Sequence, residues 1–314
     1  MAVAFVISGW RAELWQSAMA KLAPERDLRL YPDGLADRGD IRYALAWKPP
    51  PGVLATFPNL QMIFSLGAGV DHILKDPTLP EVPLVRVADP DLTMRMSEYV
   101  VQHVLMHHRQ QRRLDALQAS ATWDQLAQWP ASAVRVGVMG LGVLGTDAAC
   151  KLKMMGFPVA GWSRFRKDIE GVACFAGEAE LGAFLARTDI LVCLLPLTPA
   201  TRGLIDRKFI GKLATDGPLG GPVIINAGRG EQQVESEILA ALAAGELAAA
   251  TLDVFETEPL PPDSPLWRHQ NVTVTPHMAA DSDPETICRY VLGQIDRIER
   301  GLPAENVVDR ARGY

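Results

Sequence analysis

The sequence predicts an α/β protein with two domains, each built around a parallel β-sheet, and three observations support this prediction. The chain has 314 residues, which is more than one hydrophobic core usually serves. Short runs rich in valine and isoleucine alternate with segments that have helical spacing of apolar residues. The alternation starts again near residue 134, after one long helical segment. Strands that alternate with helices form βαβ units, whose strands are parallel.

The first hundred residues contain short apolar segments with the composition of β-strands, at residues 3–8, 43–47, 62–66 and 83–87. Residues 11–22 (RAELWQSAMAKL) have the apolar spacing of a helix. Residues 97–118 (SEYVVQHVLMHHRQQRRLDALQ) predict one further helix, long enough to connect two domains. The first half of the chain therefore predicts a parallel sheet that is followed by a connecting helix.

The second half predicts a larger sheet, with helices between strands at residues 134–140, 157–162, 189–195, 222–227, 248–255 and 271–276. A last helix is expected at about residues 284–300, after this sheet is complete, and we expect it to return to the first domain. The predicted fold is thus a pair of Rossmann-like or flavodoxin-like domains. One comprises residues 1–97 plus 283–314, the other comprises residues 98–282, and the active site is expected in the cleft between them.

The composition is that of an ordinary globular protein, with 48% hydrophobic and 22% charged residues. The net charge of −6 disfavours a nucleic-acid or acidic membrane partner, and we interpret the basic run at residues 107–114 as a solvated helix face. No segment has the length and hydropathy of a membrane span, and the N-terminus lacks the features of a signal peptide. The four cysteines form no CxxC pair, which favours a reducing compartment. We therefore expect a cytoplasmic protein.

A glycine pattern follows the predicted strand at residues 134–140 and opens a predicted helix. Its glycines are Gly140, Gly142 and Gly145, in the spacing GxGxxG. In this context the pattern is typical of dinucleotide binding, because glycines permit a tight turn and a close approach of the backbone to a pyrophosphate. The N–H groups at the start of the helix, around Val143 and Leu144, then face the phosphates. The alternative is that the three glycines only form a tight turn.

The end of the next predicted strand indicates which dinucleotide is bound. An acidic residue there usually binds the ribose 2′-hydroxyl of NAD, but Ser163 occupies the position. Arg164, Arg166 and Lys167 follow it, and these side chains can neutralise a 2′-phosphate. The sequence therefore predicts that NADP(H) is preferred and that NAD(H) binds more weakly. The alternative interpretation is a solvated basic turn.

Three polar side chains, Arg229, Glu258 and His277, come shortly after predicted strands of the second sheet. Carboxyl ends of parallel strands meet at one edge of a sheet, where ligands bind. In this order, and with the motifs around them, they closely resemble the D-isomer-specific 2-hydroxyacid dehydrogenase family. The resemblance covers nearly the whole chain and is carried by LGAGVDHI (66–73), GLGVLG (140–145), LLPLTPATRGLI (194–205), NAGRG (226–230), DVFETEPL (253–260) and TPHMAA (275–280).

Further segments resemble one group within this family, whose members reduce glyoxylate and hydroxypyruvate and prefer NADPH. They are AWKPP (46–50), WSRFRK (162–167), PLPPDSPLW (259–267) and VDRARGY (308–314). The resemblance implies an enzyme that reduces small 2-oxoacids to 2-hydroxyacids with NADPH. Residues 214–222 (ATDGPLGGP) depart from the pattern because the segment is longer than usual, so the sequence does not predict its conformation.

The residue types suit this chemistry. A guanidinium is a planar fork that can hold a carboxylate bidentately, so Arg229 is expected to anchor the substrate. Hydride transfer to the keto carbon leaves a developing alkoxide that needs a proton. A carboxylate from Glu258 beside the imidazole of His277 favours the imidazolium, which supplies a general acid near neutral pH.

The resemblance also implies roles for residues that the pattern alone does not identify. The backbone around Ala68 and Gly69 is expected to hold the substrate carboxylate, and Asp253 is expected to face the nicotinamide. Trp47 is expected to wall a small substrate pocket, although it fits equally well as a core residue. Further cofactor contacts are implied at Leu195, Pro196, Ala227 and Gly228. A homodimer is implied by the resemblance alone.

Other chemistries have less support. His103 and His107 have the i,i+4 spacing of metal ligands, but position 104 is Val where a zinc-protease helix has Glu, so we expect no metal and place both on a helix surface. No GxSxG elbow or P-loop occurs. One alternative of another class is left open: a dinucleotide-sensing, corepressor-like or scaffold protein with little turnover.

Overall fold

The structure is a computed structural model in which residues 1–35 and 37–313 are described. The chain forms two compact units, Met1–Leu92 with Asp281–Tyr314 (unit 1) and Thr93–Ala280 (unit 2). Along the chain, the boundaries between the units lie at residues 92/93 and 280/281. The boundaries expected from the sequence lie at 97/98 and 282/283. Tyr314, the last residue of the motif at 308–314, lies outside the described residues.

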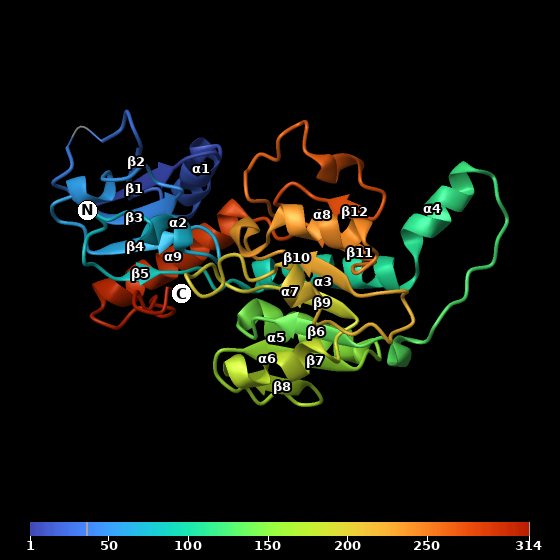
Figure 1. The fold of residues 1–314 in the computed structure, drawn as a ribbon. Helices are drawn as coiled ribbons and strands as arrows, with labels where there is room; N and C mark the ends of the chain where they lie inside the picture. The colour runs from blue at the N-terminus through green and yellow to red at the C-terminus, as the bar shows by residue number, and fades with distance from the viewer. Residues whose placement is uncertain (36, 314) are drawn as a thin grey trace. The chain divides into compact units, whose positions relative to one another are not determined.

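Unit 1 contains a parallel sheet with the strand order β2-β1-β3-β4-β5 (Figure 1). The strands are β1 Ala2–Ile7, β2 Asp27–Leu30, β3 Ile41–Trp47, β4 Met62–Ser65 and β5 Leu84–Val85. The helices are α1 Ala12–Leu22, η1 Leu54–Thr56, α2 Asp71–Leu74 and α9 Pro284–Glu299. Because α9 packs against α1, the last helix belongs to unit 1, as expected.

Every residue of the central strand β1 is buried, and β3 is buried at all but one position. Continuous apolar strands of this kind are typical of parallel sheets that are covered on both faces. The edge strand β2 (DLRL) is only partly buried. Its polar pattern lacks the apolar run from which the other strands were predicted, so the sequence did not reveal it.

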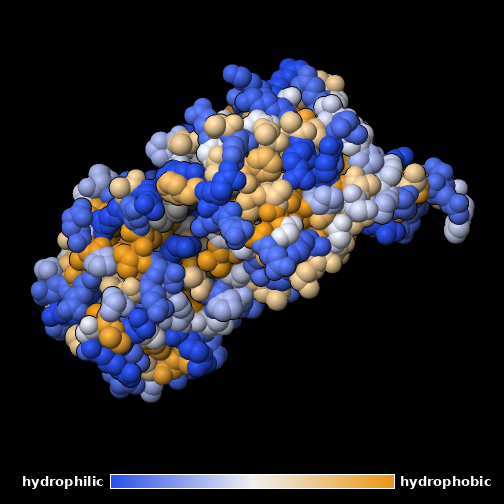
Figure 2. All heavy atoms as spheres, turned by 90° about the horizontal axis from the view of Figure 1, so that it is seen from below, coloured by the Kyte–Doolittle hydropathy of each residue, from blue (hydrophilic) through white to orange (hydrophobic). Residues whose placement is uncertain are grey.

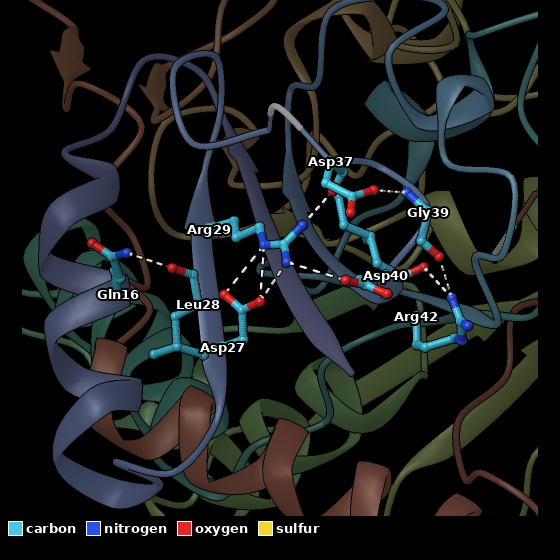
Figure 3. A network of polar contacts seen from close by, with 9 residues as sticks. Gln16, Asp27, Leu28, Arg29, Asp37, Gly39, Asp40 and Arg42 are labelled. Carbon is cyan, nitrogen blue, oxygen red and sulfur yellow. Dashed lines mark hydrogen bonds and ion pairs between the residues drawn. The ribbon is translucent and has the colours of Figure 1, made fainter.

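Charged side chains cover this edge strand (Figure 3). Arg29 donates to both carboxylate oxygens of Asp27, to the carbonyl of Asp37, and lies 3.7 Å from a carboxylate oxygen of Asp40. Arg42 donates to the carbonyl of Gly39 at 2.7 Å. Charged residues on an edge strand disfavour pairing with another chain. The network therefore protects the open edge of the first sheet.

Unit 2 contains a larger parallel sheet with the order β12-β11-β10-β9-β6-β7-β8 (Figure 1). Its strands are β6 Val136–Met139, β7 Val159–Ser163, β8 Ala173–Ala176, β9 Ile190–Cys193, β10 Val223–Asn226, β11 Ala249–Leu252 and β12 Val272–Val274. Its helices are α3 Pro90–His108, which begins at the end of unit 1, α4 Gln111–Ala119, η2 Ala131–Ala133, α5 Val143–Met154, α6 Gly177–Leu185, α7 Arg207–Ile210, η3 Gly230–Gln232, α8 Glu235–Ala243 and η4 Pro265–Arg268. The prediction of two parallel α/β sheets is confirmed.

The strand order of unit 2 reverses beside β6. The chain runs outward through β7 and β8, and then returns to pair β9 against the other side of β6. In open parallel sheets, ligands bind outside the carboxyl ends of the strands at such a switch point. Gly140 directly follows β6 and Leu194 directly follows β9, so these two residues mark that point in this protein.

The connecting helix expected at residues 97–118 is wrong in part, because two helices occupy this stretch. Helix α3 ends at His108 and α4 begins at Gln111, with Gln110 between them in a left-handed conformation (φ 57°). His103 is buried, which also corrects its expected place on a helix surface. His107 Nε2 lies 2.8 Å from Thr251 Oγ1 of β11, and burial lowers the pKa of His107 to about 3.

Residues 214–222, whose conformation the sequence did not predict, are held by contacts with Arg135 and Asp189 of the same unit. Asp216 pairs with Arg135 at 2.5 Å, and Arg135 also pairs with the buried Asp189. Gly217 allows this approach, since a Cβ there would lie 2.1 Å from a carboxylate oxygen of Asp189. The first half of this segment is therefore fixed by a defined ion-pair cluster.

The face seen in Figure 2 is largely hydrophilic, and hydrophobic residues reach it in separate patches. Among the described residues, no helix has the length and hydropathy needed to cross a membrane. Within the same residues, no three His, Cys, Asp or Glu side chains are grouped as metal ligands would be.

Candidate active site

The turn between β6 and α5 holds the glycine pattern. Gly140 has φ 102°, and a Cβ there would lie 2.6 Å from the carbonyl oxygen of Leu194. A Cβ on Gly145 would lie 2.0 Å from the carbonyl oxygen of Gly140, so only glycine lets α5 pack this closely. A Cβ on Gly142, in contrast, would meet no atom within 4 Å. The turn is therefore tightly packed on its protein side and open at Gly142, where the unpaired N–H groups of a helix start are available to a phosphate.

The basic turn at residues 163–167 begins at Ser163, the last residue of β7, one residue beyond the expected strand end at Trp162. Ser163 Oγ donates to the carbonyl of Phe165 at 2.6 Å, which closes the turn. Arg164 and Lys167 are exposed. Arg166 donates to the carbonyl of Cys174 at 2.8 Å and forms an ion pair with Glu180 of α6. The guanidinium of Arg166 thus already has partners within unit 2, which sequence reasoning missed.

Glu258 and His277 come together at the carboxyl ends of β11 and β12. His277 Nδ1 lies 2.8 Å from Glu258 Oε2. The other carboxylate oxygen of Glu258 accepts from the N–H of Phe255 at 3.3 Å. With Glu258 ionised, Nδ1 is the donor in this pair, so Nε2 is the ring nitrogen that remains for another partner. Both side chains are partly exposed, 33% for His277 and 24% for Glu258, so a small molecule can reach them.

A buried carboxylate holds the backbone around His277, which has φ 51°, unusual for a residue other than glycine. Asp253 is 1% exposed, and its oxygens accept from Thr275 Oγ1 and from the N–H groups of Met278 and Ala279, at 2.7 to 3.0 Å. Tyr99 of α3 lies 2.8 Å from the same Thr275 hydroxyl. Burial raises the pKa of Tyr99, which keeps the phenol protonated. The carboxylate of Asp253 therefore holds the segment on both sides of His277 by hydrogen bonds.

Arg229 follows β10, the strand next to β11, at the same edge of the sheet. Its guanidinium donates to the carbonyl of Gly228 at 2.7 Å. Its backbone N–H donates to Gln232 Oε1 at 2.9 Å, and its backbone carbonyl accepts from Asn226 Nδ2 at 3.3 Å. Gln232 and Asn226 are fully buried. Sequence reasoning assigned no role to either side chain, although Asn226 begins the NAGRG motif and the polar pair Gln232-Gln233 follows it after Glu231.

In unit 1, residues 66–70 follow β4. Ser65 Oγ, buried at the end of β4, lies 3.0 Å from the carbonyl of Gly67 and 3.1 Å from that of Gly69. Ala68 and Gly69 are partly exposed, so their backbone remains accessible. Ser65 was not predicted, and it braces the loop from within the sheet.

Trp47, the last residue of β3, packs against this loop. A Cβ on Gly67 would lie 2.5 Å from its ring. The ring stacks on Trp10 with centroids 4.1 Å apart and lies 4.5 Å from the ring of His72. Trp47 is only 8% exposed. The side chain is therefore fixed in an aromatic cluster, with one edge beside residues 66–70.

The remaining residues expected to bind a cofactor also lie at strand ends of unit 2. Leu195 and Pro196 follow β9, and their carbonyls accept from Gln232 Nε2 at 2.8 and 3.1 Å. Ala227 and Gly228 follow β10, and the N–H of Gly228 donates to Asn226 Oδ1 at 3.0 Å. The carboxyl edge of this sheet therefore carries the glycine turn, the basic turn, Arg229 and the Glu258–His277 pair.

The chain is similar to known proteins in sequence and in fold. Residues 101–279 match the family model described as "D-isomer specific 2-hydroxyacid dehydrogenase, NAD binding domain". The chain is 42% identical over 306 residues to a glyoxylate/hydroxypyruvate reductase A of Escherichia fergusonii, covering 96% of each. A Sinorhizobium meliloti NADPH-dependent glyoxylate/hydroxypyruvate reductase, solved with NADP and sulfate, is 48% identical with TM-score 0.96, covering 100% of each chain. A Xanthobacter autotrophicus D-isomer specific 2-hydroxyacid dehydrogenase, solved with NADPH and MES, is 43% identical with TM-score 0.94, covering 100% of this chain and 99% of that one.

Proposed function

The chain belongs to the D-isomer specific 2-hydroxyacid dehydrogenase family, and we propose that it reduces the small 2-oxoacids glyoxylate and hydroxypyruvate to 2-hydroxyacids with NADPH. The membership confirms the resemblance found in the motifs. The observation that carries the proposal is the contact of 2.8 Å between His277 Nδ1 and Glu258 Oε2. Glu258 follows β11, His277 follows β12, and Arg229 follows β10, the strand next to β11. The names of the Escherichia and Sinorhizobium relatives support the choice of substrates.

In the proposed reaction, bound NADPH supplies a hydride to the keto carbon. His277 gives its Nε2 proton to the developing alkoxide, and it later regains a proton from water. Glu258 accepts the Nδ1 proton in a hydrogen bond, which orients the ring and stabilises the imidazolium before transfer. The keto group thus gains one hydride on carbon and one proton on oxygen, and the same pair acts as a base in the reverse direction.

Arg229 is the proposed anchor of the substrate carboxylate. Its guanidinium presents a planar set of donors, of which Nη1 is used by the carbonyl of Gly228. We propose that the accessible backbone of Ala68 and Gly69 completes the carboxylate site and that Trp47 limits its width.

The fit of a dinucleotide to unit 2 supports NADP(H) as the cofactor. The space at Gly142 and the start of α5 at Val143 and Leu144 suit a pyrophosphate. Ser163 with the basic residues at 164, 166 and 167 suits a 2′-phosphate, and a carboxylate that would repel it is absent from the end of β7. NAD(H) lacks this phosphate and is expected to bind more weakly. The proposed nicotinamide end of the site lies among Leu195, Pro196, Ala227, Gly228 and the segment held by Asp253.

We also propose a cytoplasmic homodimer. Helix α4 and the segment after it project from the rest of unit 2 (Figure 1), and no residue of α4 is buried. Trp123, in that segment, is 94% exposed. A second copy is the partner expected to cover this surface. Light scattering tests the proposal: the dimer has twice the chain mass of 34.2 kDa, and a species of 34.2 kDa at assay concentrations would reject it.

The decisive test of function is the absorbance of NADPH during incubation with glyoxylate or hydroxypyruvate. Steady oxidation of NADPH, with lower kcat/KM for the bulkier phenylpyruvate, is the expected result. Tight binding of NADPH without turnover of any of these acids would favour the alternative, a dinucleotide-sensing corepressor-like or scaffold protein.

A further inference from the structure

A fully buried glutamine lies beneath the loop that carries Arg229. Gln232 is the last residue of η3 and is 0% exposed. Its Oε1 accepts from the N–H of Arg229 at 2.9 Å and from Cys193 Sγ at 3.6 Å. Its Nε2 donates to the carbonyls of Leu195 at 2.8 Å and Pro196 at 3.1 Å. A carboxamide can accept two hydrogen bonds and donate two, so this side chain is fully satisfied.

These partners leave the carboxamide of Gln232 only one orientation. Rotating it by 180° would place an N–H against the N–H of Arg229 and an oxygen against two carbonyl oxygens. Burial raises the pKa of the Cys193 thiol to about 11, so the thiol stays protonated and remains a donor. An unsatisfied buried polar group destabilises a fold, so the flipped arrangement is excluded.

The backbone carbonyl of Arg229 is also held by a side-chain amide. It accepts from Asn226 Nδ2 at 3.3 Å, and the same amide nitrogen donates to Gln233 Oε1 at 2.8 Å. Gln233 Nε2 donates in turn to the carbonyl of Val254, beyond β11, at 2.9 Å. Both backbone polar groups of Arg229 are therefore held by buried side-chain amides.

Close packing removes the space in which this loop could relax. A Cβ on Gly228 would lie 2.5 Å from Gln232 Oε1. A Cβ on Gly230 would lie 1.9 Å from the backbone carbonyl of Phe255. The glycines on both sides of Arg229 are thus needed for backbone and amide to approach each other, and the loop has one packed conformation.

From this geometry we propose that Gln232 is a positioning residue, which fixes the substrate anchor Arg229 relative to the loop after β9. The inference rests on the function proposed above, in which Arg229 binds the substrate carboxylate and Leu195 and Pro196 lie beside the cofactor. One amide touches both segments. Its removal would let Arg229 move relative to that loop, and misplacement of a binding group by about 1 Å can lower the rate by about 10²-fold.

The test replaces Gln232 with Met, which has similar length and makes none of the four hydrogen bonds. The matched control is Gln294→Met, because Gln294 is also buried, at 4% exposed, and accepts from the N–H of Glu305 in unit 1. We expect Gln232→Met to raise the KM for glyoxylate about 10- to 100-fold. The Kd of NADPH, measured by fluorescence, is expected to change less than the KM, because the proposed phosphate contacts are at the start of α5 and in the basic turn at residues 163–167. The control is expected to keep both values.

Gln232→Asn is the milder second variant, since it retains an amide but cannot reach both segments. It should raise the KM for glyoxylate in the same direction with a smaller loss of Tm. Lower Tm and kcat in both variants with an unchanged KM would overturn the proposal, because they would reveal a purely structural role. If the wild-type protein does not reduce glyoxylate, the proposed function fails instead. Hydrogen exchange of the Arg229 backbone N–H, which needs no turnover, then decides. Faster exchange in Gln232→Asn than in wild type supports the positioning role of Gln232, and an unchanged rate rejects it.

Discussion

The preference for NADPH is expected to depend on the basic turn at residues 163–167, through its arginine side chains. Arg164 is exposed, whereas Arg166 is held by Glu180 and by the carbonyl of Cys174. A hydrogen bond to a charged group contributes about 1.5–3 kcal/mol, and an exposed ion pair up to about 1 kcal/mol. Replacing both arginines with Ala should therefore cost about 2–3 kcal/mol of NADPH binding, or about 30- to 150-fold in kcat/KM.

The Arg166→Ala single variant is expected to lose less than the double variant, because the guanidinium of Arg166 is shared with Glu180. The assay measures kcat/KM for NADPH and for NADH at saturating glyoxylate. NADH values should stay within about twofold of wild type, since NADH has no 2′-phosphate to lose. Arg289→Ala removes a 67% exposed arginine of α9 and serves as the control. Equal losses for the two cofactors would refute the assignment.

Three other substitutions probe separate parts of the account. Arg229→Lys keeps the charge but loses the planar fork, so steady-state kinetics should show a higher KM for glyoxylate and a lower kcat; an unchanged KM would contradict the anchor role. His277→Gln should lower kcat by about 10²- to 10⁴-fold while fluorescence titration shows NADPH still bound. The partly buried His107, near His103 and Arg112, has a folded-state pKa of about 3, below the unfolded value of about 6.5. The unfolded chain therefore binds more protons, and stability falls as the pH drops through this window. Urea unfolding at pH 7 and pH 4.5 should show a smaller acid loss for His107→Gln, which can still bond to Thr251, than for wild type; an equal loss would reject this cause.

The parts of the fold and site that the sequence predicted are those that local chemistry determines. Gly140 has a positive φ, and Gly145 packs against the carbonyl of Gly140 within the same turn, so their spacing indicates that turn. The buried strands of both sheets are mainly apolar, as is typical of parallel strands that are covered on both faces. Ser163 could be singled out from the sequence because it lies at the end of a recognisable strand, where NAD-binding proteins usually have an acidic residue.

The parts that the sequence did not predict depend on contacts between distant segments. The helical pattern of the sequence continues from α3 into α4, yet the chain turns at Gln110, and no residue of α4 is buried. The pairing of Arg166 with Glu180 joins residues from a turn and a later helix. Gln232 has the appearance of a surface residue in the sequence, and only the folded loop shows that its amide is buried.

The central claim is that Glu258 and His277 together supply the proton for reduction, and the pH profile of kcat/KM for glyoxylate tests it most directly. Glu258→Gln keeps the size of the side chain but removes the charge that lies 2.8 Å from His277 Nδ1. Reduction needs the imidazolium, which the carboxylate stabilises. The account predicts that the alkaline limb of the profile moves to lower pH in the variant. An alkaline limb at the same pH in both proteins would contradict the coupling and assign the proton to another group.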